Sequence, residues 1–225
     1  MNKSSLPFVI IGGVLLIAIG VSVWLFKQSP AAPPNNNLST KNADNPKGIP
    51  LGAEPAHTQG NPAAKVYIEE FGDFQCPPCG ALHPEIKKIE AEFGDSIAFT
   101  FRNYPLSNLH PHAYDAARAA EAAGMQGKYW EMHDKIYDNQ STWTSAPDPR
   151  AEFENYARLL GLNVEQFRND SISPMVSGRV RSDMQRATAI GVTGTPTVFI
   201  NGHQVSADNT TLEGIRNIIN TELKK

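Results

Sequence analysis

The chain has 225 residues, with 20 basic and 23 acidic side chains and a formal net charge of −3 at pH 7. This length allows one or two domains, and the near balance of charges argues against a nucleic-acid partner. Cysteine occurs only twice, which excludes a scaffold held together by many disulfides. The folded part must therefore be stabilised by a hydrophobic core.

An uncharged, mostly apolar stretch lies near the start of the chain, at residues 6–26. Its length matches the roughly 20 apolar residues that a membrane-spanning helix needs, and the following residues 29–31 form a poor cleavage site. We therefore predict that residues 1–27 are a short cytoplasmic stub and an uncleaved transmembrane anchor. A cleaved signal peptide is the alternative, and both place the remaining chain on the periplasmic or extracellular side of the cell membrane.

A segment rich in proline and asparagine follows, at residues 28–61. It has almost no periodic apolar pattern, so it cannot bury enough surface to offset the entropy of ordering. We predict a linker here and a folded domain over residues 62–225.

The folded domain begins with a strand–helix–strand pattern. Residues 66–71 and 97–101 are typical of strands, and residues 76–93 show helical spacing of apolar side chains. This order predicts a βαβ unit with parallel strands. Helical patterns then fill about residues 106–190.

The end of the chain returns to strand character. Residues 197–200 predict a strand, and Asn201-Gly202 is a strong signal for a hairpin. Apolar residues at helical spacing then predict a terminal helix over residues 212–223.

Both cysteines belong to one motif, Cys76-Pro-Pro-Cys79, between the first predicted strand and helix. Such a placement is typical of a thioredoxin-type redox centre. We expect Cys76 at the start of the helix, where unpaired backbone N–H groups and the helix dipole favour a thiolate nucleophile. Cys79, one turn deeper, is expected to resolve mixed disulfides. Pro78 lacks an N–H and so removes one of the donors available to Cys76.

The alternative for the cysteine pair is a zinc or copper site that includes His83. A structural zinc ion takes four ligands, and the chain has no third cysteine. A redox role is therefore favoured. His110, His112 and His133 lie in predicted helical context and are expected to be surface or packing residues rather than ligands.

Three separated stretches, residues 70–79, 124–133 and 191–202, resemble in order the DsbA-like branch of the thioredoxin superfamily. These proteins are bacterial thiol-disulfide oxidoreductases of the cell envelope. The resemblance covers about residues 60–225. It implies an α/β, thioredoxin-like fold into which a helical domain is inserted at about residues 106–190.

The resemblance also implies roles for residues outside the cysteine pair. Pro196 would form a cis peptide bond and lie against the cysteines, and the backbone of Thr195 would face an extended substrate. Glu70 would be a buried carboxylate that assists proton transfer at the inner cysteine. The alternative for Glu70 is a solvated strand residue, with Glu69 and Asp73 as neighbouring competitors.

The function implied is transfer of the Cys76–Cys79 disulfide to secreted or periplasmic proteins with cysteine thiols. A DsbB-like, quinone-linked membrane protein would reoxidise the pair, and no cofactor or metal is expected beyond the redox-active disulfide. Two alternatives stay open: a disulfide reductase or isomerase, and a metal-binding chaperone on a thioredoxin fold.

Overall fold

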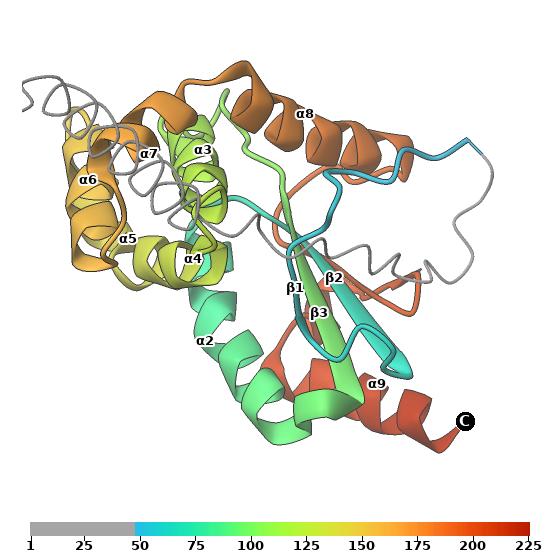
Figure 1. Ribbon diagram of the computed structural model, residues 1–225. Helices are drawn as coiled ribbons and strands as arrows, with labels where there is room; N and C mark the ends of the chain where they lie inside the picture. Colours follow the sequence, from blue (N-terminus) through green and yellow to red (C-terminus); the bar gives the residue numbers. More distant parts are fainter. Residues whose placement is uncertain (1–47) are drawn as a thin grey trace, which may run out of the picture. The chain divides into compact units, whose positions relative to one another are not determined.

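The computed structural model describes residues 48–225, and the predicted membrane anchor lies outside this part of the chain (Figure 1). A five-stranded sheet in the order β1-β3-β2-β4-β5 forms the centre. The strands are β1 (Thr58–Gly60), β2 (Val66–Gly72), β3 (Ile97–Asn103), β4 (Thr197–Ile200) and β5 (His203–Gln204). β2 and β3 are parallel, and the other neighbouring pairs are antiparallel.

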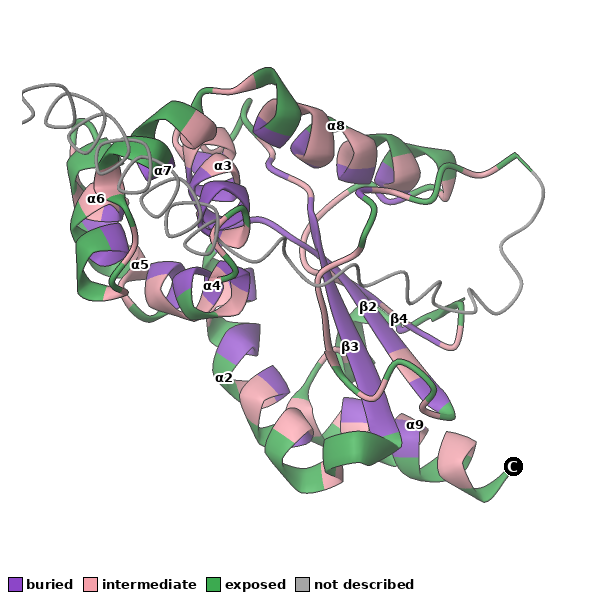
Figure 2. Ribbon diagram, viewed as in Figure 1, coloured by how far each residue is buried: buried purple, intermediate pink, exposed green. Residues whose placement is uncertain are grey.

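The two central strands form the core of the sheet. Every residue of β3 and all but one of β2 are buried, as the purple strands of Figure 2 show. Helix α2 (Pro77–Phe93), followed by the short turn η1 (Gly94–Ser96), connects them and confirms the predicted βαβ unit. Helix α9 (Leu212–Lys224), which follows η2 (Ala207–Asn209), packs against α2 and β2.

A helical insertion separates β3 from β4 and confirms the predicted inserted domain. It contains α3 (Ala113–Gly124), α4 (Tyr129–Asp138), α5 (Gln140–Trp143), α6 (Arg150–Leu159), α7 (Val164–Ser171) and α8 (Pro174–Ala189). The alanines of α3 are buried because α4, α7 and α8 pack around this helix. Small side chains there allow the helices to approach closely.

The predicted hairpin is also present. Asn201 and Gly202 join β4 to β5 and have φ values of 49° and 79°. These left-handed conformations are the ones that a tight Asn-Gly hairpin turn requires.

The predicted start of the folded domain at residue 62 is wrong. β1 begins at Thr58 within the predicted linker and pairs with β3. Upstream of it Ala53 is buried, and its backbone N–H and carbonyl bond to Asp183 and Arg102. The proline-rich composition of this segment led to the prediction of a linker. The segment is nevertheless ordered, because its partners Arg102, Asp183 and β3 lie far along the chain. Within residues 48–225, none of the helices combines the length and apolar character that crossing a membrane requires.

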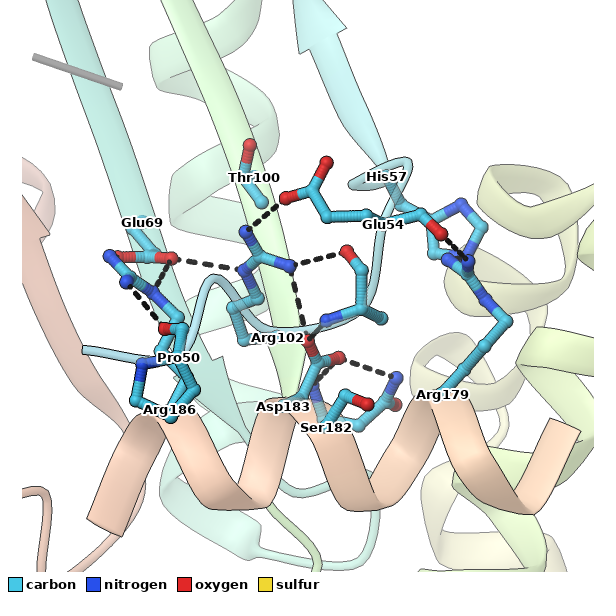
Figure 3. Close-up of polar contacts among 12 residues, drawn as sticks. Pro50, Glu54, His57, Glu69, Thr100, Arg102, Arg179, Ser182, Asp183 and Arg186 are labelled. Atoms are coloured by element: carbon cyan, nitrogen blue, oxygen red, sulfur yellow. Dashed lines mark hydrogen bonds and ion pairs between the residues drawn. The ribbon is translucent and has the colours of Figure 1, made fainter. Parts of the chain in front are cut away.

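A buried ion-pair network joins the sheet to α8 (Figure 3). Arg102 of β3 donates from Nε to Glu69 of β2 at 3.0 Å and from Nη1 to Asp183 of α8 at 3.1 Å. Arg186, one turn later in α8, makes two bonds of 2.8 Å to the same Glu69 carboxylate. The charges of β2, β3 and α8 are thus balanced by one another inside the protein.

Replacing Arg102 by Leu should strongly destabilise the fold. Asp183 would keep its buried negative charge without the guanidinium that pairs with it, and breaking a buried pair in this way costs about 3–5 kcal/mol. Urea unfolding of Arg102→Leu measures the loss. Arg150→Leu is the control, because Arg150 makes a similar pair with Asp148 on the surface. Equal unfolding midpoints for the two variants would contradict the assigned importance of the network.

Candidate functional site

The cysteine pair lies where β2 leads into α2. After Gly72 the chain turns, and the Cys76 N–H donates to the Asp73 carbonyl at 3.1 Å. Cys76 is the N-cap of α2, with φ −71° and ψ 120°, and its carbonyl accepts the first helical hydrogen bond from Gly80. Pro77 and Pro78 occupy the first two helical positions, where the helix does not need their N–H groups. The predicted position of Cys76 is confirmed.

The environment of Cys76 favours its thiolate. Its pKa is lowered to about 6, first by a hydrogen bond from the Cys79 thiol and then by contacts with Thr195 and the Cys79 backbone, against an opposing effect of burial. No backbone N–H forms a regular N-cap hydrogen bond with the Cys76 sulfur. Pro78 offers none, as the sequence indicated, so the neighbouring thiol is the main donor.

Cys79 has the opposite preference. It is fully buried, and burial is the first cause that raises its pKa, followed by the hydrogen bond with Cys76 and the charge of Glu70. A proton on Cys79 is what allows this residue to donate to the Cys76 thiolate. The motif therefore holds one sulfur that ionises readily and one that keeps its proton.

Three acidic residues near the motif have different surroundings. Glu70 is buried beside the cysteines, and its pKa is raised to about 8 by burial first and then by the charges of Glu90 and Cys76. This excludes the solvated alternative for Glu70. Glu69, on the other side of β2, pairs with Arg102. Glu70 is thus the carboxylate of β2 that can exchange a proton near the thiols.

Asp73, the third acidic residue, organises the turn before Cys76. Its Oδ1 accepts a hydrogen bond from the Gln75 N–H at 2.7 Å. Its Oδ2 accepts from the Leu106 N–H and lies 2.8 Å from His110 Nδ1. The prediction of helical context for His110 is wrong, because α3 begins only at Ala113. His110 instead lies in a loop that Asp73 holds beside the motif.

The segment before β4 closes the site on the other side. Thr195-Pro196 is a cis peptide bond, as the family resemblance implied. The Thr195 carbonyl lies 3.4 Å from the Cys76 sulfur and accepts a hydrogen bond from it when Cys76 is protonated.

Gln140 is a site residue that sequence reasoning missed. Its side-chain amide reaches from α5 and donates to the carbonyls of Phe74 and Cys76, at 2.7 and 2.9 Å. These bonds fix the backbone on both sides of the turn that leads into α2. Gln140 lies far from the motif along the chain, so no local pattern could have identified it.

The cysteines do not form the alternative metal site with His83. In the described part of the chain, the one group of three or more side chains close enough to hold a metal ion is His83, His133 and Asp134. His83 also lies 3.6 Å from Asp138. Both thiols are free, and the arrangement around them suits thiol-disulfide exchange.

Replacing Cys79 by Ala should raise the pKa of Cys76. The variant loses the thiol that is the main donor to the thiolate, and a hydrogen bond to a charged group is worth enough to move the pKa by about one pH unit or more. The rate of Cys76 alkylation by iodoacetamide, measured against pH, gives the midpoint. Cys79→Ser keeps a donor and should shift it less. An unchanged midpoint in Cys79→Ala would mean that the start of the helix alone sets this pKa.

Replacing Gln140 by Ala should loosen the turn before Cys76. The buried Phe74 carbonyl would lose its donor, at a cost of about 1–3 kcal/mol in unfolding free energy. Urea unfolding of the reduced protein tests this. The control is Gln126→Ala, which breaks an amide pair with Asn163 on the surface. A loss no larger than that of the control would contradict the positioning role.

Comparison with known proteins places these features in a family. A sequence model described as thioredoxin matches residues 53–221. Among curated relatives, the Na(+)/H(+) antiporter NhaA 1 of Mycolicibacterium gilvum is 38% identical over 157 residues, which are 68% of this chain and 24% of the antiporter. The antiporter NhaA of Herminiimonas arsenicoxydans is 35% identical, over 73% of this chain and 26% of its own length. The chain thus spans about a quarter of the length of these relatives.

Solved structures match over most of their length. BdbD from Bacillus subtilis in its oxidised form has a TM-score of 0.68 and 22% identity, covering 76% of this chain and 94% of BdbD. A thioredoxin-like oxidoreductase from Silicibacter pomeroyi has a TM-score of 0.60 and 25% identity, with coverage of 76% and 93%. The thiol-disulfide exchange protein alpha-DsbA2 from Wolbachia pipientis has a TM-score of 0.63 and 22% identity, covering 74% of this chain and 86% of alpha-DsbA2. The chain therefore belongs to the thioredoxin family, and its fold is that of the DsbA-like thiol-disulfide oxidoreductases.

Proposed function

We propose that this protein donates the Cys76–Cys79 disulfide to other proteins that carry reduced cysteines. The observation that carries the proposal is the contrast between the two sulfurs: the pKa of Cys76 is lowered to about 6, and that of Cys79 is raised. A stabilised Cys76 thiolate lowers the free energy of the reduced form. That makes the disulfide a better oxidant.

The first step is attack of a substrate thiolate on the Cys76 sulfur of the disulfide. A bond forms between the substrate sulfur and Cys76, and the Cys76–Cys79 bond breaks. Cys79 leaves as a thiolate and then takes a proton, because burial disfavours its charge. Glu70 has a pKa of about 8 and holds a proton at neutral pH, so it is the group proposed to supply this proton.

The second step releases the oxidised substrate. A second substrate thiolate attacks the substrate sulfur of the mixed disulfide, and Cys76 leaves. Two electrons have then passed from the substrate dithiol to the motif. With a pKa of about 6, Cys76 leaves as a thiolate without needing a proton at neutral pH, and a leaving thiol of low pKa departs faster.

The substrate would bind along the Thr195-Pro196 segment. The Thr195 carbonyl already accepts a hydrogen bond from the Cys76 thiol. In an extended substrate chain, a backbone N–H could occupy the same acceptor. We assign Thr195 and Pro196 to substrate binding on this basis, with no cofactor besides the disulfide.

The cellular setting proposed is the bacterial envelope. The uncharged residues 6–26 would anchor the chain in the cell membrane, with the catalytic domain on the periplasmic or extracellular side. Substrates would be secreted proteins, and a DsbB-like membrane protein would restore the disulfide. In the competing assignment, a reductase or isomerase, the same exchange runs from the dithiol form.

Trapping experiments in cells test the proposal. Cys79→Ser cannot form the intramolecular disulfide, but its Cys76 thiolate can still attack disulfides of partner proteins. The resulting mixed disulfides should accumulate, because the Cys79 thiol that would displace the partner from Cys76 is absent, whereas Cys76→Ser should form none. Alkylation after acid quenching should find the wild-type pair as a disulfide. A pair found as a dithiol would favour the reductase or isomerase. Adducts formed by Cys76→Ser but not by Cys79→Ser would reverse the roles of the two cysteines.

A further inference from the structure

A second cluster of reactive side chains lies between α2 and α4, beginning one helical turn after Cys79. His83 comes from α2, and His133, Asp134 and Asp138 come from α4. His83 Nε2 is 4.0 Å from Asp134 Oδ1 and 3.6 Å from Asp138 Oδ1. His133 Nδ1 is 3.0 Å from Asp134 Oδ1. Two imidazoles and two carboxylates from neighbouring helices thus converge.

These separations are close to those of a tetrahedral metal site. Bonds of about 2.0–2.2 Å from zinc to nitrogen or oxygen place neighbouring ligand atoms roughly 3.3–3.5 Å apart. One ligand atom each from His83, His133 and Asp134 already lies within 4.8 Å of the others. Rotation of the Asp138 carboxylate and small shifts of the rings would close the remaining difference. Asp138 is exposed and has that freedom.

A neighbouring side chain orients one of the candidate ligands. Lys87 holds Asp134 through the other oxygen, Oδ2, at 3.1 Å, and so leaves Oδ1 directed at the histidines. Such outer contacts orient metal ligands.

Two further observations indicate that the cluster can accept an additional ligand. His133 Nε2 is buried without a hydrogen-bond partner within residues 48–225, so a proton on Nδ1 can be donated to Asp134 while Nε2 keeps a free lone pair. A cavity of about 10 Å³ is lined by His83, His133, Asp134, Lys87 and Glu90 among others. That is room for one water or one small ion.

The charges near the cluster also favour a cation. Asp134 and Asp138 lie near His83, and Glu90 lines the same small cavity. Lys87 is the cation paired with Asp134 and Glu90. The carboxylates outnumber this ammonium group, so a bound dication would reduce the net negative charge. Imidazole and carboxylate ligands together suit zinc and similar first-row metals.

We propose that His83, His133, Asp134 and Asp138 form a binding site for a divalent transition-metal ion, with Zn²⁺ as the expected ligand. The metal would link α2, which carries the redox motif at its start, to α4 of the helical insertion. This site is separate from the cysteines and does not depend on the proposed disulfide donation.

The test uses the full chain with its disulfide closed, because oxidised cysteines cannot bind the metal. Complete oxidation is verified by the absence of free thiols. Calorimetric titration with Zn²⁺ should find one ion per chain. Co²⁺ should give the visible absorption of a four-coordinate site without a thiolate band. A Zn²⁺-dependent, saturable rise in melting temperature should accompany binding.

Variants identify the ligands. His83→Asn and Asp138→Asn should each weaken Zn²⁺ binding by at least the roughly 10- to 100-fold seen when outer-shell partners are lost. Asp138→Asn changes an exposed side chain and so tests the site without disturbing the core. His203→Asn, in the exposed strand β5, is the control and should bind as wild type does. Absence of binding to the oxidised wild type, or unchanged affinity in both ligand variants, would overturn the proposal.

Discussion

The buried guanidinium of Arg102 is the constraint on which the rest of the structure depends. It bridges Glu69 and Asp183, and Arg186 completes the pairing of Glu69. A buried charge that loses its partner is costly, so β2 and α8 cannot shift independently. β2 leads directly into the cysteine motif, and α8 leads into the cis bond at Pro196. One network therefore anchors both chain segments that meet at the Cys76 sulfur.

The three acidic residues around the end of β2 are similar in sequence but have different structural environments. Glu69 and Glu70 point to opposite sides of the sheet. One therefore joins the Arg102 network and the other is buried near the thiols. Asp73 lies beyond the strand and holds the turn and the loop that contains His110. The sequence identifies all three as candidate proton-transfer residues, but only the structural environment of each side chain shows which one lies near the thiols.

The features predicted from sequence are those with local signals. The cysteine motif, the start of α2 and the Asn201-Gly202 turn each depend on residues within a few positions. Gln140 and β1 were missed because their partners lie far along the chain: Gln140 bonds to Cys76, and β1 pairs with β3 across the following βαβ unit. No periodicity encodes such contacts, and the proline-rich surroundings of β1 suggested disorder instead.

The helical insertion does more than cover the redox centre. Gln140 from the insertion fixes the backbone at Cys76, and the pKa of Tyr137 in α4 is raised, first by its complete burial and then by the nearby Cys79 and Glu70. Exclusion of water on this side makes charge expensive for both Cys79 and Glu70, so each keeps its proton at pH 7. The negative charge of the reduced pair then resides on Cys76, at the start of α2. By adding to the burial of Cys79, the insertion contributes to the contrast between the two sulfurs.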